Sequence, residues 1–372
     1  MLTRADVEKL LSIREVGPSV LSLYLRVPLD QPALRGLPAR VDDLLARAGR
    51  GGSDDREVQQ AQDEDRHMAR RSLEIHARDW LGHTVAIFAC GQQQLAETFV
   101  LPGTLPERAV FATRPHVRPL LLALDRSPGY YLAIVDQQHA WVLRVSGERI
   151  DTMTRLAAEG VPSRGFGGWY GLEAHRVHDR VIELARHHQR DTARVLRQIM
   201  SAGRPELLVL GGHDDEIPQF LAMLTGDQRA RFAGSFAADP HHLTAARARH
   251  LADEVVGHWI EAGEQRLVAQ VRQEPGRLTA IGLQPCLDAV NQRAVQLLIV
   301  PEDGMIPGFT CQRCAMLSTT GTDCPDWGAA ALAVPDLIEE MAVTAIEDGA
   351  QVEAVDDPPG GIAARLRFPL AG

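Results

Sequence analysis

A glycine-rich stretch near the middle of the chain also holds an arginine and two aromatic residues: Arg164-Gly165-Phe166-Gly167-Gly168-Trp169-Tyr170. Three glycines in four positions disfavour a helix or a strand and permit close approach of the backbone to a ligand. Trp169 and Tyr170 are suited to stacking on unpaired bases, and Arg164 supplies a guanidinium group that binds phosphate. These residue types favour contact with nucleic acid. The alternative interpretation is a mobile surface loop, which can have the same sequence pattern.

A long helix with an arginine face is predicted directly after this stretch, from Leu172 to about Ser201. One side of its 3.6-residue wheel carries Val177, Val181, Leu184, His188, Val195 and Ile199. The opposite side carries Arg176, Arg180, Arg186, Arg190, Arg194 and Arg197. A row of guanidinium groups suits a phosphate backbone, and a solvated charged face is the alternative. The RNA-binding candidates are Arg164, Trp169, Tyr170, His175, Arg176, Arg180, Arg190 and Arg194.

Two histidines of this predicted helix carry different expectations. His188 falls on the apolar side, where a buried, hydrogen-bonded core histidine is expected. His175 lies close to the glycine-rich stretch, where it could touch RNA or act as a general base. No serine or cysteine nucleophile stands beside His175 in the sequence, so we keep it as an RNA-binding candidate.

Three cysteines toward the C-terminus have the spacing of metal ligands. Cys311-Gln312-Arg313-Cys314 forms a knuckle motif, and Cys324 follows. Structural zinc sites close four ligands, but Trp327 stands where a fourth thiol is expected. Asp323 or Asp326 could complete the tetrahedron; otherwise the site has lost its metal. Zinc is the candidate cofactor, and its candidate ligands are Cys311, Cys314 and Cys324.

An acidic cluster follows a predicted buried strand at Glu206–Leu210. It runs from His213 to Glu216, directly after two glycines. Ligands often bind at the carboxyl end of a strand, so a metal site is conceivable there. The alternative is a solvated turn before a helix at Pro218–Leu224, which polar clusters commonly form.

Composition and net charge favour a soluble globular protein over one that coats nucleic acid. The chain has 372 residues, is 45% hydrophobic and 24% charged, and its mean hydropathy is −0.13, as in soluble globular proteins. The net charge of −10 argues against coating nucleic acid by bulk charge, but it permits a local basic face. Lys9 is the only lysine, so arginine carries nearly all the positive charge.

The sequence also indicates in which compartment of the cell the protein resides. No apolar run approaches the eighteen or so residues that span a bilayer, and the N-terminus lacks the apolar core of a signal peptide. We therefore expect a cytoplasmic protein without a membrane partner. Five cysteines do not suggest a disulfide scaffold, and Cys90 and Cys286 are expected to be buried thiols.

The elements that must position these residues alternate between helix and strand. We predict an α/β (α+β mixed) fold with three α/β domains, at 1–115, 116–250 and 251–372, because the chain exceeds one ordinary core. In the first, residues 3–15 form a helix capped by Thr3, and residues 19–27 form a strand with one buried face. Its other expected elements are helices at 37–48 and 55–78, strands at 84–90 and 95–101, and a glycine linker at 49–53.

The second domain is expected to place the glycine loop before the long helix, and the third to carry the small cysteine-bearing insert. The second begins with strands at 130–136, 140–146 and 149–155. A helix at 243–273 links the two domains. The third is expected to hold helices at 285–292 and 335–348, and strands at 295–300, 351–355 and 361–368.

In this order the elements resemble those of the archaeal and eukaryotic class I peptide-chain release factors and their relative Pelota. The likeness is greatest to the bacterial branch of that superfamily. The second domain matches through the 130–155 hairpin, the glycine loop, the arginine helix and the 207–211 strand. In the third, residues 294–302 (AVQLLIVPE) and 360–368 (GGIAARLRF) are similar to the strand before the family's zinc insert and to its closing strand. The first domain is similar only in general plan.

The resemblance implies a tRNA-shaped protein that enters the ribosomal A site and reaches the peptidyl-transferase centre with a Gly-Gly-Gln loop. There the glutamine helps to place water on the ester of peptidyl-tRNA. The matching positions are Gly167, Gly168 and Trp169, which are the candidate catalytic loop. The implied partner is the ribosome, with its rRNA and peptidyl-tRNA, and a translational GTPase is a further candidate.

Two departures from the family pattern change the expected function. Trp169 replaces the glutamine, and an indole has one N–H donor and no acceptor with which to position water. Losing such a group commonly costs on the order of a hundredfold in rate. The Asn-Ile-Lys-Ser tetrapeptide that release factors use at the stop codon is absent from the sequence. We therefore predict a ribosome-binding factor of rescue, quality control or hibernation, without efficient hydrolysis.

Two alternatives stay open. One is an enzyme of the same fold, a peptidyl-tRNA hydrolase or a tRNA-cleaving enzyme, because the backbone amides of the loop survive any change of side chain. The other is a non-ribosomal interaction module that has kept only the fold. Ribosome binding and peptide release, measured on the purified protein, separate the three hypotheses.

Overall fold

The structure is a computed structural model of the 372-residue chain. It describes residues 2–13, 19–48, 56–147, 149–158, 172–203, 206–273, 276–311, 313–321, 323–324 and 327–370. The side chains of Arg4 and of residues 172–181 lie outside this description. The glycine linker predicted at 49–53 also falls outside it.

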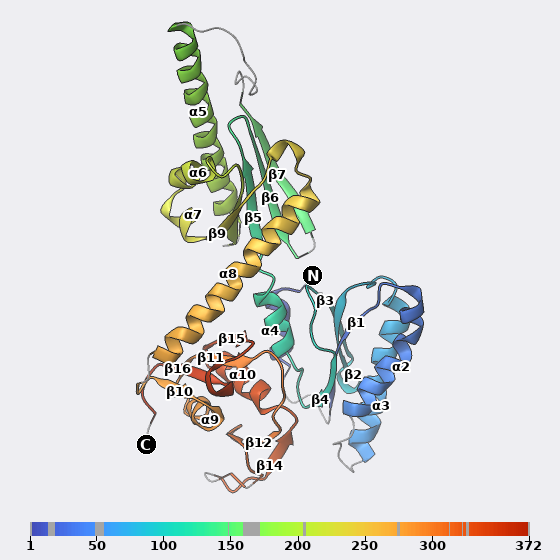
Figure 1. Ribbon diagram of the computed structural model, residues 1–372. Coiled ribbons are helices and arrows are strands. Elements are labelled where there is room, and N and C mark those ends of the chain that lie inside the picture. Colours follow the sequence, from blue (N-terminus) through green and yellow to red (C-terminus); the bar gives the residue numbers. More distant parts are fainter. Residues whose placement is uncertain are drawn as a thin grey trace. The chain divides into compact units, whose positions relative to one another are not determined.

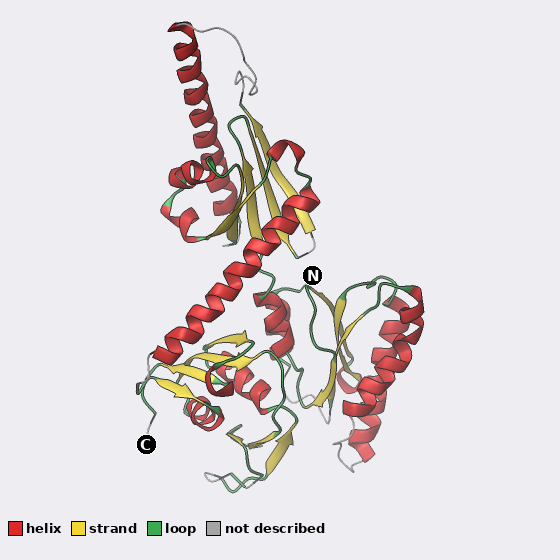
Figure 2. Ribbon diagram, in the orientation of Figure 1, coloured by secondary structure: helices red, strands yellow, loops and turns green. Residues whose placement is uncertain are grey.

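Contacts divide the chain into two compact units. The discontinuous unit comprises Met1–Arg126 and Glu264–Gly372, and the central unit comprises Ser127–Gly263. Helices and strands are mixed in both units, so the predicted α/β class is confirmed (Figure 2). The domain boundaries at 115 and 250 stay predictions. No helix in the described ranges is long and apolar enough to cross a membrane.

A four-stranded antiparallel sheet forms the N-terminal part of the discontinuous unit, with strand order β3-β2-β1-β4. Helices α2 and α3 cover one face of it through the leucines and valines that they bury (Figure 1). Thr3 and Asp6 form the predicted capping box at the start of α1. The elements are α1 Arg4–Leu11, β1 Val20–Arg26, α2 Gln31–Ala48, α3 Arg56–His76, β2 Thr84–Cys90, β3 Leu95–Leu101 and β4 Arg108–Ala112.

Strand β1 corrects one expectation, because it is buried on both faces. Leu23 and its alternate neighbours pack against α2 and α3, as the alternation predicts. Ser22 and Tyr24, expected to face solvent, are buried as well, and the Tyr24 hydroxyl donates to the backbone oxygen of His116 at 2.5 Å. The reason is a second layer, in which Tyr24 joins a core shared with the C-terminal part of this unit.

The C-terminal part of the discontinuous unit contains a mixed four-stranded sheet, of order β10-β16-β11-β15, and a three-stranded sheet, of order β13-β12-β14. Helix α4, Arg118–Asp125, joins its core although it precedes the central unit in sequence. The strands are β10 Thr279–Ile281, β11 Val295–Pro301, β12 Gly308–Cys311, β13 Leu317–Ser318, β14 Ala331–Val334, β15 Gln351–Val355 and β16 Ala363–Leu366. The helices are α9 Leu283–Asn291 and α10 Leu337–Glu347.

A buried charge network fastens the start of α4 to α10. Arg118 is only 1% exposed, and its Nη2 lies 2.8 Å from Asp336 Oδ2. His116 Nε2 lies 3.1 Å from the same carboxylate oxygen. Glu339 Oε2 accepts the backbone N–H of Arg118 at 3.0 Å. Each of these two carboxylates has a cationic or backbone donor, so the network stabilises the contact between α4 and α10.

The central unit is a five-stranded sheet with helices on both faces. Its order is β7-β6-β5-β8-β9; β5 and β6 pair antiparallel, as do β6 and β7, whereas β5, β8 and β9 run parallel. Helices α5 and α6 pack on one face and the beginning of α8 on the other (Figure 1). The strands are β5 Tyr130–Val135, β6 His139–Ser146, β7 Arg149–Ala157, β8 Leu207–Gly212 and β9 Phe232–Ala237. The helices are α5 Leu172–Ala202, α6 Ile217–Met223, α7 Gly226–Ala230 and α8 Ala245–Gln273.

Candidate nucleic-acid interface and metal-ligand clusters

Helix α5 confirms the predicted long helix and buries one face against the central sheet. Among the described residues of the predicted apolar side, only His188 is deeply buried. Leu184, Val195 and Ile199 are only half-buried. The deeply buried positions are Ala185, His188, Gln189, Thr192, Ala193, Leu196 and Met200. The buried face therefore centres on His188, Thr192 and Leu196, to one side of the face that the sequence predicted.

The opposite face of α5 presents four exposed arginines, Arg186, Arg190, Arg194 and Arg197. Arg190 lies 3.4 Å from Glu183, and Arg194 lies 2.8 Å from Asp191. Such exposed pairs contribute about 0–1 kcal/mol, so a phosphate can compete with either carboxylate. Neither Arg186 nor Arg197 makes a hydrogen bond or ion pair with any residue that the structure describes. Those two guanidinium groups, absent from the candidate set drawn from the sequence, complete the row.

The other RNA-binding candidates and the candidate catalytic loop stay predictions. Arg164, Gly167, Gly168, Trp169 and Tyr170 lie outside the described residues. The backbone places His175, Arg176 and Arg180 in the first part of α5, but their side chains are among those not described.

His188 is buried in the central unit, as predicted. Burial lowers the pKa of its imidazole, and the ring hydrogen-bonds the backbone of His139. Only one ring nitrogen of His188 is hydrogen-bonded, because Nε2 has no hydrogen-bond partner in the described part of the chain. A neutral histidine therefore sits directly behind the turn between β5 and β6.

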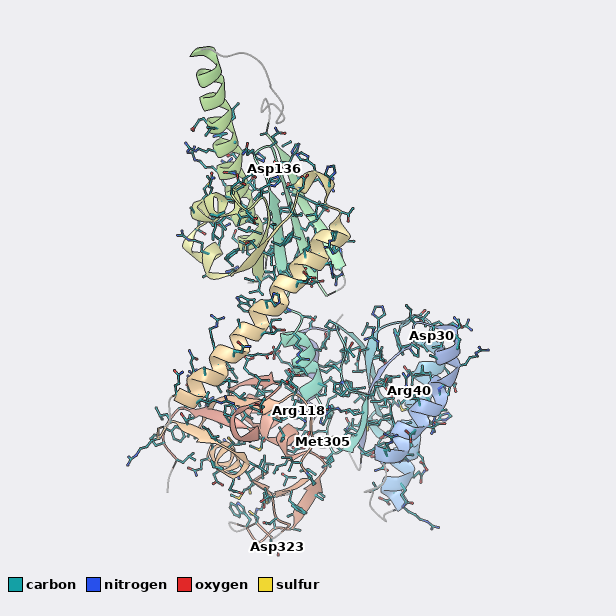
Figure 3. The ribbon with its side chains drawn as sticks, in the orientation of Figure 1. Asp30, Arg40, Arg118, Asp136, Met305 and Asp323 are labelled. Atoms are coloured by element: carbon teal, nitrogen blue, oxygen red, sulfur yellow. The ribbon has the colours of Figure 1, made fainter. Side chains whose placement is uncertain are left out.

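The carboxyl ends of β5, β8 and β9 gather polar side chains at one edge of the central sheet. Asp136 follows β5, His213 and Glu216 follow β8, and His241 follows β9. The pairing of β5 with β8 in parallel brings the first two segments together, with Val135 opposite Gly212. Figure 3 labels Asp136 near the upper end of the central sheet. The sequence pointed to this edge through the cluster after β8 alone.

Glu216 departs from the solvated turn expected there. Asp214 and Asp215 are exposed, but Glu216 is buried and its pKa is raised by that burial. Its side chain hydrogen-bonds Gln137, in the turn after β5. The acidic cluster is thus divided: two carboxylates face solvent, and the third joins the two turns.

The three predicted zinc ligands come together at the end of β12. The Sγ atoms of Cys311, Cys314 and Cys324 all lie within 4.8 Å of one another. Backbone N–H groups of Cys314 and Arg313 hydrogen-bond the Cys311 sulfur and lower its pKa to about 7. Three sulfur ligands with supporting N–H groups fit three positions of a tetrahedral zinc site, which holds a fold together when the ion is bound.

The fourth position of that site is not supplied by the described candidates. Asp323 is exposed and is not among the described residues whose ligand atoms reach the three sulfurs. Asp326 lies outside the described residues. Trp327 is 53% exposed and stacks under the guanidinium of Arg313, 4.2 Å from the ring centre. Cys90 and Cys286 are buried, as predicted.

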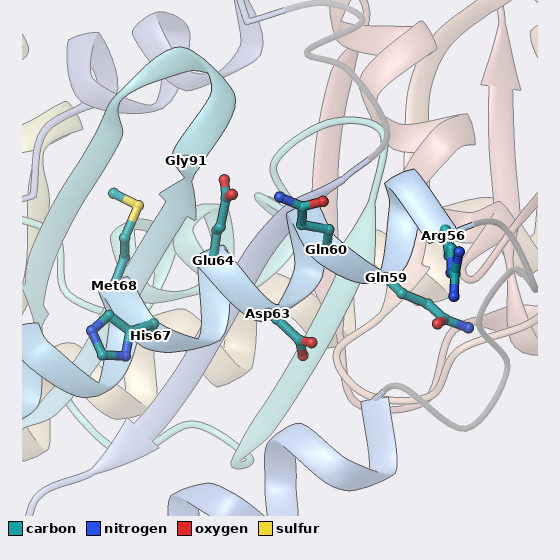
Figure 4. A pocket seen from close by; sticks show the side chains of 8 residues that line it. All are labelled: Arg56, Gln59, Gln60, Asp63, Glu64, His67, Met68 and Gly91. Carbon is teal, nitrogen blue, oxygen red and sulfur yellow. The ribbon is translucent and has the colours of Figure 1, made fainter.

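A surface hollow next to the N-terminal sheet is lined chiefly by residues of helix α3. Its lining residues are Arg56, Gln59, Gln60, Asp63, Glu64, His67, Met68 and Gly91. Figure 4 shows these side chains directed to different sides of α3. They do not converge on one point, so the hollow lacks the focused donors of a ligand site.

Comparison with known proteins finds a family match in the central part of the chain. Residues 115–273 match the sequence model of the Bacterial archaeo-eukaryotic release factor family 10. The chain is also 25% identical, over 285 residues, to peptide chain release factor subunit 1 of Thermoplasma acidophilum. That alignment covers 68% of this chain and 67% of the archaeal protein.

Similar solved structures include a translation termination factor and two Pelota proteins. An archaeal translation termination factor is 15% identical, with a TM-score of 0.25, over 98% of this chain and 97% of its own. Archaeoglobus fulgidus Pelota is 14% identical, with a TM-score of 0.37, over 79% and 81%. A ribosome-bound archaeal Pelota is 16% identical, with a TM-score of 0.41, over 78% and 79%.

Proposed function

We propose that this release-factor- and Pelota-like protein is a translation factor that binds the ribosomal A site and contacts rRNA and peptidyl-tRNA. The match of residues 115–273 to a release-factor family carries the proposal. Those residues include the central unit and the whole of α5. Ribosome rescue, quality control or hibernation in the cytoplasm is the proposed role, and a translational GTPase is a further proposed partner.

The exposed face of α5 supplies the physical basis for RNA contact. Arg186 and Arg197 stand eleven residues apart, so the row they bound extends about 16 Å along the helix axis at about 1.5 Å per residue. Guanidinium groups bind phosphate oxygens in a planar, bidentate manner and release condensed counterions. Since the whole chain carries a net charge of −10, this attraction is local to the helix.

Efficient peptide release is not part of the proposal, because Trp169 stands where the family has glutamine. The indole N–H can donate but cannot accept a hydrogen bond from water. Gly167 and Gly168 are kept, and they favour the second candidate function, peptidyl-tRNA hydrolysis driven by the loop backbone. A tRNA-cleaving enzyme and a non-ribosomal module are the other outcomes that an experiment must separate.

The test combines binding and release in one assay. Purified protein is sedimented with ribosomes, with and without peptidyl-tRNA, and released peptide is scored in the same tubes for the wild type and Trp169→Gln. We expect both proteins to co-sediment, and any release to be confined to the glutamine variant. Release by the wild type would establish the hydrolase, and absence of binding in every tube would overturn the ribosomal proposal.

A further inference from the structure

A cluster of one aspartate and two histidines at the edge of the central sheet has no role in the proposed RNA contact. Asp136 directly follows β5, His139 begins β6, and His241 lies in a short 3-10 helix, Pro240–His242, after β9. One ligand atom from each residue lies within 4.8 Å of the other two. Side chains from the β5–β6 turn and from the segment after β9 therefore converge on one point.

Hydrogen bonds fix one carboxylate oxygen of Asp136, and the other has no hydrogen-bond partner among the described residues. It is 5% exposed, and its Oδ1 accepts the backbone N–H groups of Gln138 and His139, both at 2.6 Å. The other oxygen, Oδ2, is buried and has no hydrogen-bond partner in the described part of the chain. A buried carboxylate oxygen without a donor is costly, which points to a ligand at that position.

The two histidines face this carboxylate at nearly the spacing of a metal site. His241 Nε2 lies 3.6 Å from Asp136 Oδ2, and His139 Nδ1 lies 3.8 Å from Oδ1. The two imidazole rings meet edge to face, with centres 5.2 Å apart. Tetrahedral bonds of about 2.0–2.1 Å set ligand atoms about 3.4 Å apart. Both histidines are about half-exposed, so small rotations of their rings would close the remaining difference.

We propose that Asp136, His139 and His241 bind a divalent transition-metal ion of the zinc class. Two imidazoles and one carboxylate suit Zn²⁺ and its neighbours, whereas Mg²⁺ and Ca²⁺ prefer oxygen ligands alone. Three protein ligands leave a fourth position open to water or an anionic ligand. That position faces a hollow lined in part by Trp141, Arg155 and Thr244.

The bound ion would link the β5–β6 turn to the segment that follows β9. The Oδ1 hydrogen bonds hold the β5–β6 turn, and the His188 ring supports the same turn from behind through the His139 backbone. His241 enters from the segment that leads into α8. Arg155 stacks on Trp141, 4.6 Å from the ring centre, and forms the cationic wall of the hollow. An anionic group is therefore the ligand that the open metal position would accept.

The test is a Co²⁺ titration of the full chain, repeated with Zn²⁺ competition. Thiolate ligands give intense near-ultraviolet charge-transfer bands, so binding at the cysteine cluster is read separately from binding at nitrogen and oxygen ligands. The variants are Asp136→Asn, which keeps Oδ1 as an acceptor, and His241→Gln. His242→Gln is the matched control, because His242 is adjacent in sequence and its side chain is 87% exposed.

We expect the wild type and His242→Gln to bind one more equivalent of Co²⁺, without thiolate bands, than the two ligand variants. The affinity of that equivalent should fall on the order of a hundredfold or more when a ligand is removed, since loss of an outer partner alone costs about 10–100-fold. Equal stoichiometry and affinity in the wild type and both ligand variants would overturn the proposal. If circular dichroism shows Asp136→Asn to be unfolded, the half-exposed His241→Gln variant decides.

Discussion

At the residue scale, one buried carboxylate of the discontinuous unit, Glu340, has a strongly raised pKa. Glu340 lies on α10 beside Glu339 and Asp336, and its side chain is 4% exposed. Burial raises the pKa of Glu340 to about 7, against the opposing effect of Arg114, whose Nη2 lies 3.0 Å away. The ordinary value is 4.5, so the protonated carboxyl is the form that the folded chain favours.

This shift predicts a loss of stability as the pH rises from about 4.5 to about 7. Because the pKa of Glu340 is raised on folding, its contribution is full below pH 4.5 and is lost as the pH rises through about 7. The Glu340→Gln variant should remove on the order of 1–3 kcal/mol from the difference in unfolding free energy between pH 5 and pH 8. Urea denaturation across that range measures it, with Glu347→Gln, on the other side of Arg114, as the control. An unchanged pH dependence in Glu340→Gln would contradict the assignment.

At the element scale, the central sheet requires glycine where β8 meets β5. A Cβ on Gly212 would lie 2.5 Å from the backbone oxygen of Val135, a contact that side-chain motion cannot relieve. A Cβ on Gly211 would lie 2.7 Å from Phe236 on β9. Both glycines end β8 directly below the polar edge, so their close packing fixes the spacing between Asp136 and the turn after β8.

Gly212→Ala is therefore expected to destabilise the central unit by about 1–3 kcal/mol, the usual cost of overpacking. Gly226→Ala is the matched control, because a Cβ there meets nothing within 4 Å at the start of α7. Thermal unfolding of both variants should show a lower midpoint for Gly212→Ala alone. A midpoint equal to that of the control would show that β5 and β8 can separate without loss.

Elements with strong local patterns could be predicted from the sequence. The strands predicted at 84–90 and 95–101 match the bounds of β2 and β3, and the 3.6-residue spacing of α5 predicted its length to within about one residue. Long-range packing caused the failures. Strand β1 reads as half-exposed because the layer that covers Tyr24 comes from another part of the chain. Strand β9, FAGSFA, has small residues in place of alternation and was missed.

The candidate site was predictable only where its residues are neighbours in sequence. The arginine row lies on one helix, and Cys311 and Cys314 share one knuckle, so periodicity and spacing suffice for both. Asp136 and His241 are brought together by the order of β5, β8 and β9, which sequence spacing does not encode. Because β9 was not predicted, nothing placed His241 beside Asp136.

At the scale of the whole molecule, the two halves of the discontinuous unit share one hydrophobic core. Tyr24 and Phe88 of the N-terminal sheet belong to the same buried cluster as Leu298 and Met341 of the C-terminal part. The central unit has its own buried clusters, one on each face of its sheet. Each unit therefore has its own core, and the core of the discontinuous unit is built from both the N-terminal and the C-terminal part of the chain.

This division predicts different behaviour for two fragments. Residues 127–263 should unfold cooperatively when expressed alone, because their cores lie within the fragment. Residues 1–126 alone should bind a hydrophobic dye and lack a cooperative transition, because the face around Tyr24 loses its cover. Chemical denaturation followed by circular dichroism compares them. A folded monomer of 1–126 would contradict the shared core.

The central claim is that α5 binds ribosomal RNA through its arginine row. Its most direct measurement is the salt dependence of ribosome affinity for Arg186→Glu/Arg197→Glu. Arg247→Glu is the control, since this arginine is also exposed in the central unit but lies on α8. We predict that the double variant binds at least about tenfold more weakly and that its slope of log affinity against log salt is smaller in magnitude by about 1–2. Equal affinity and slope for the wild type, the control and the double variant would contradict the claim.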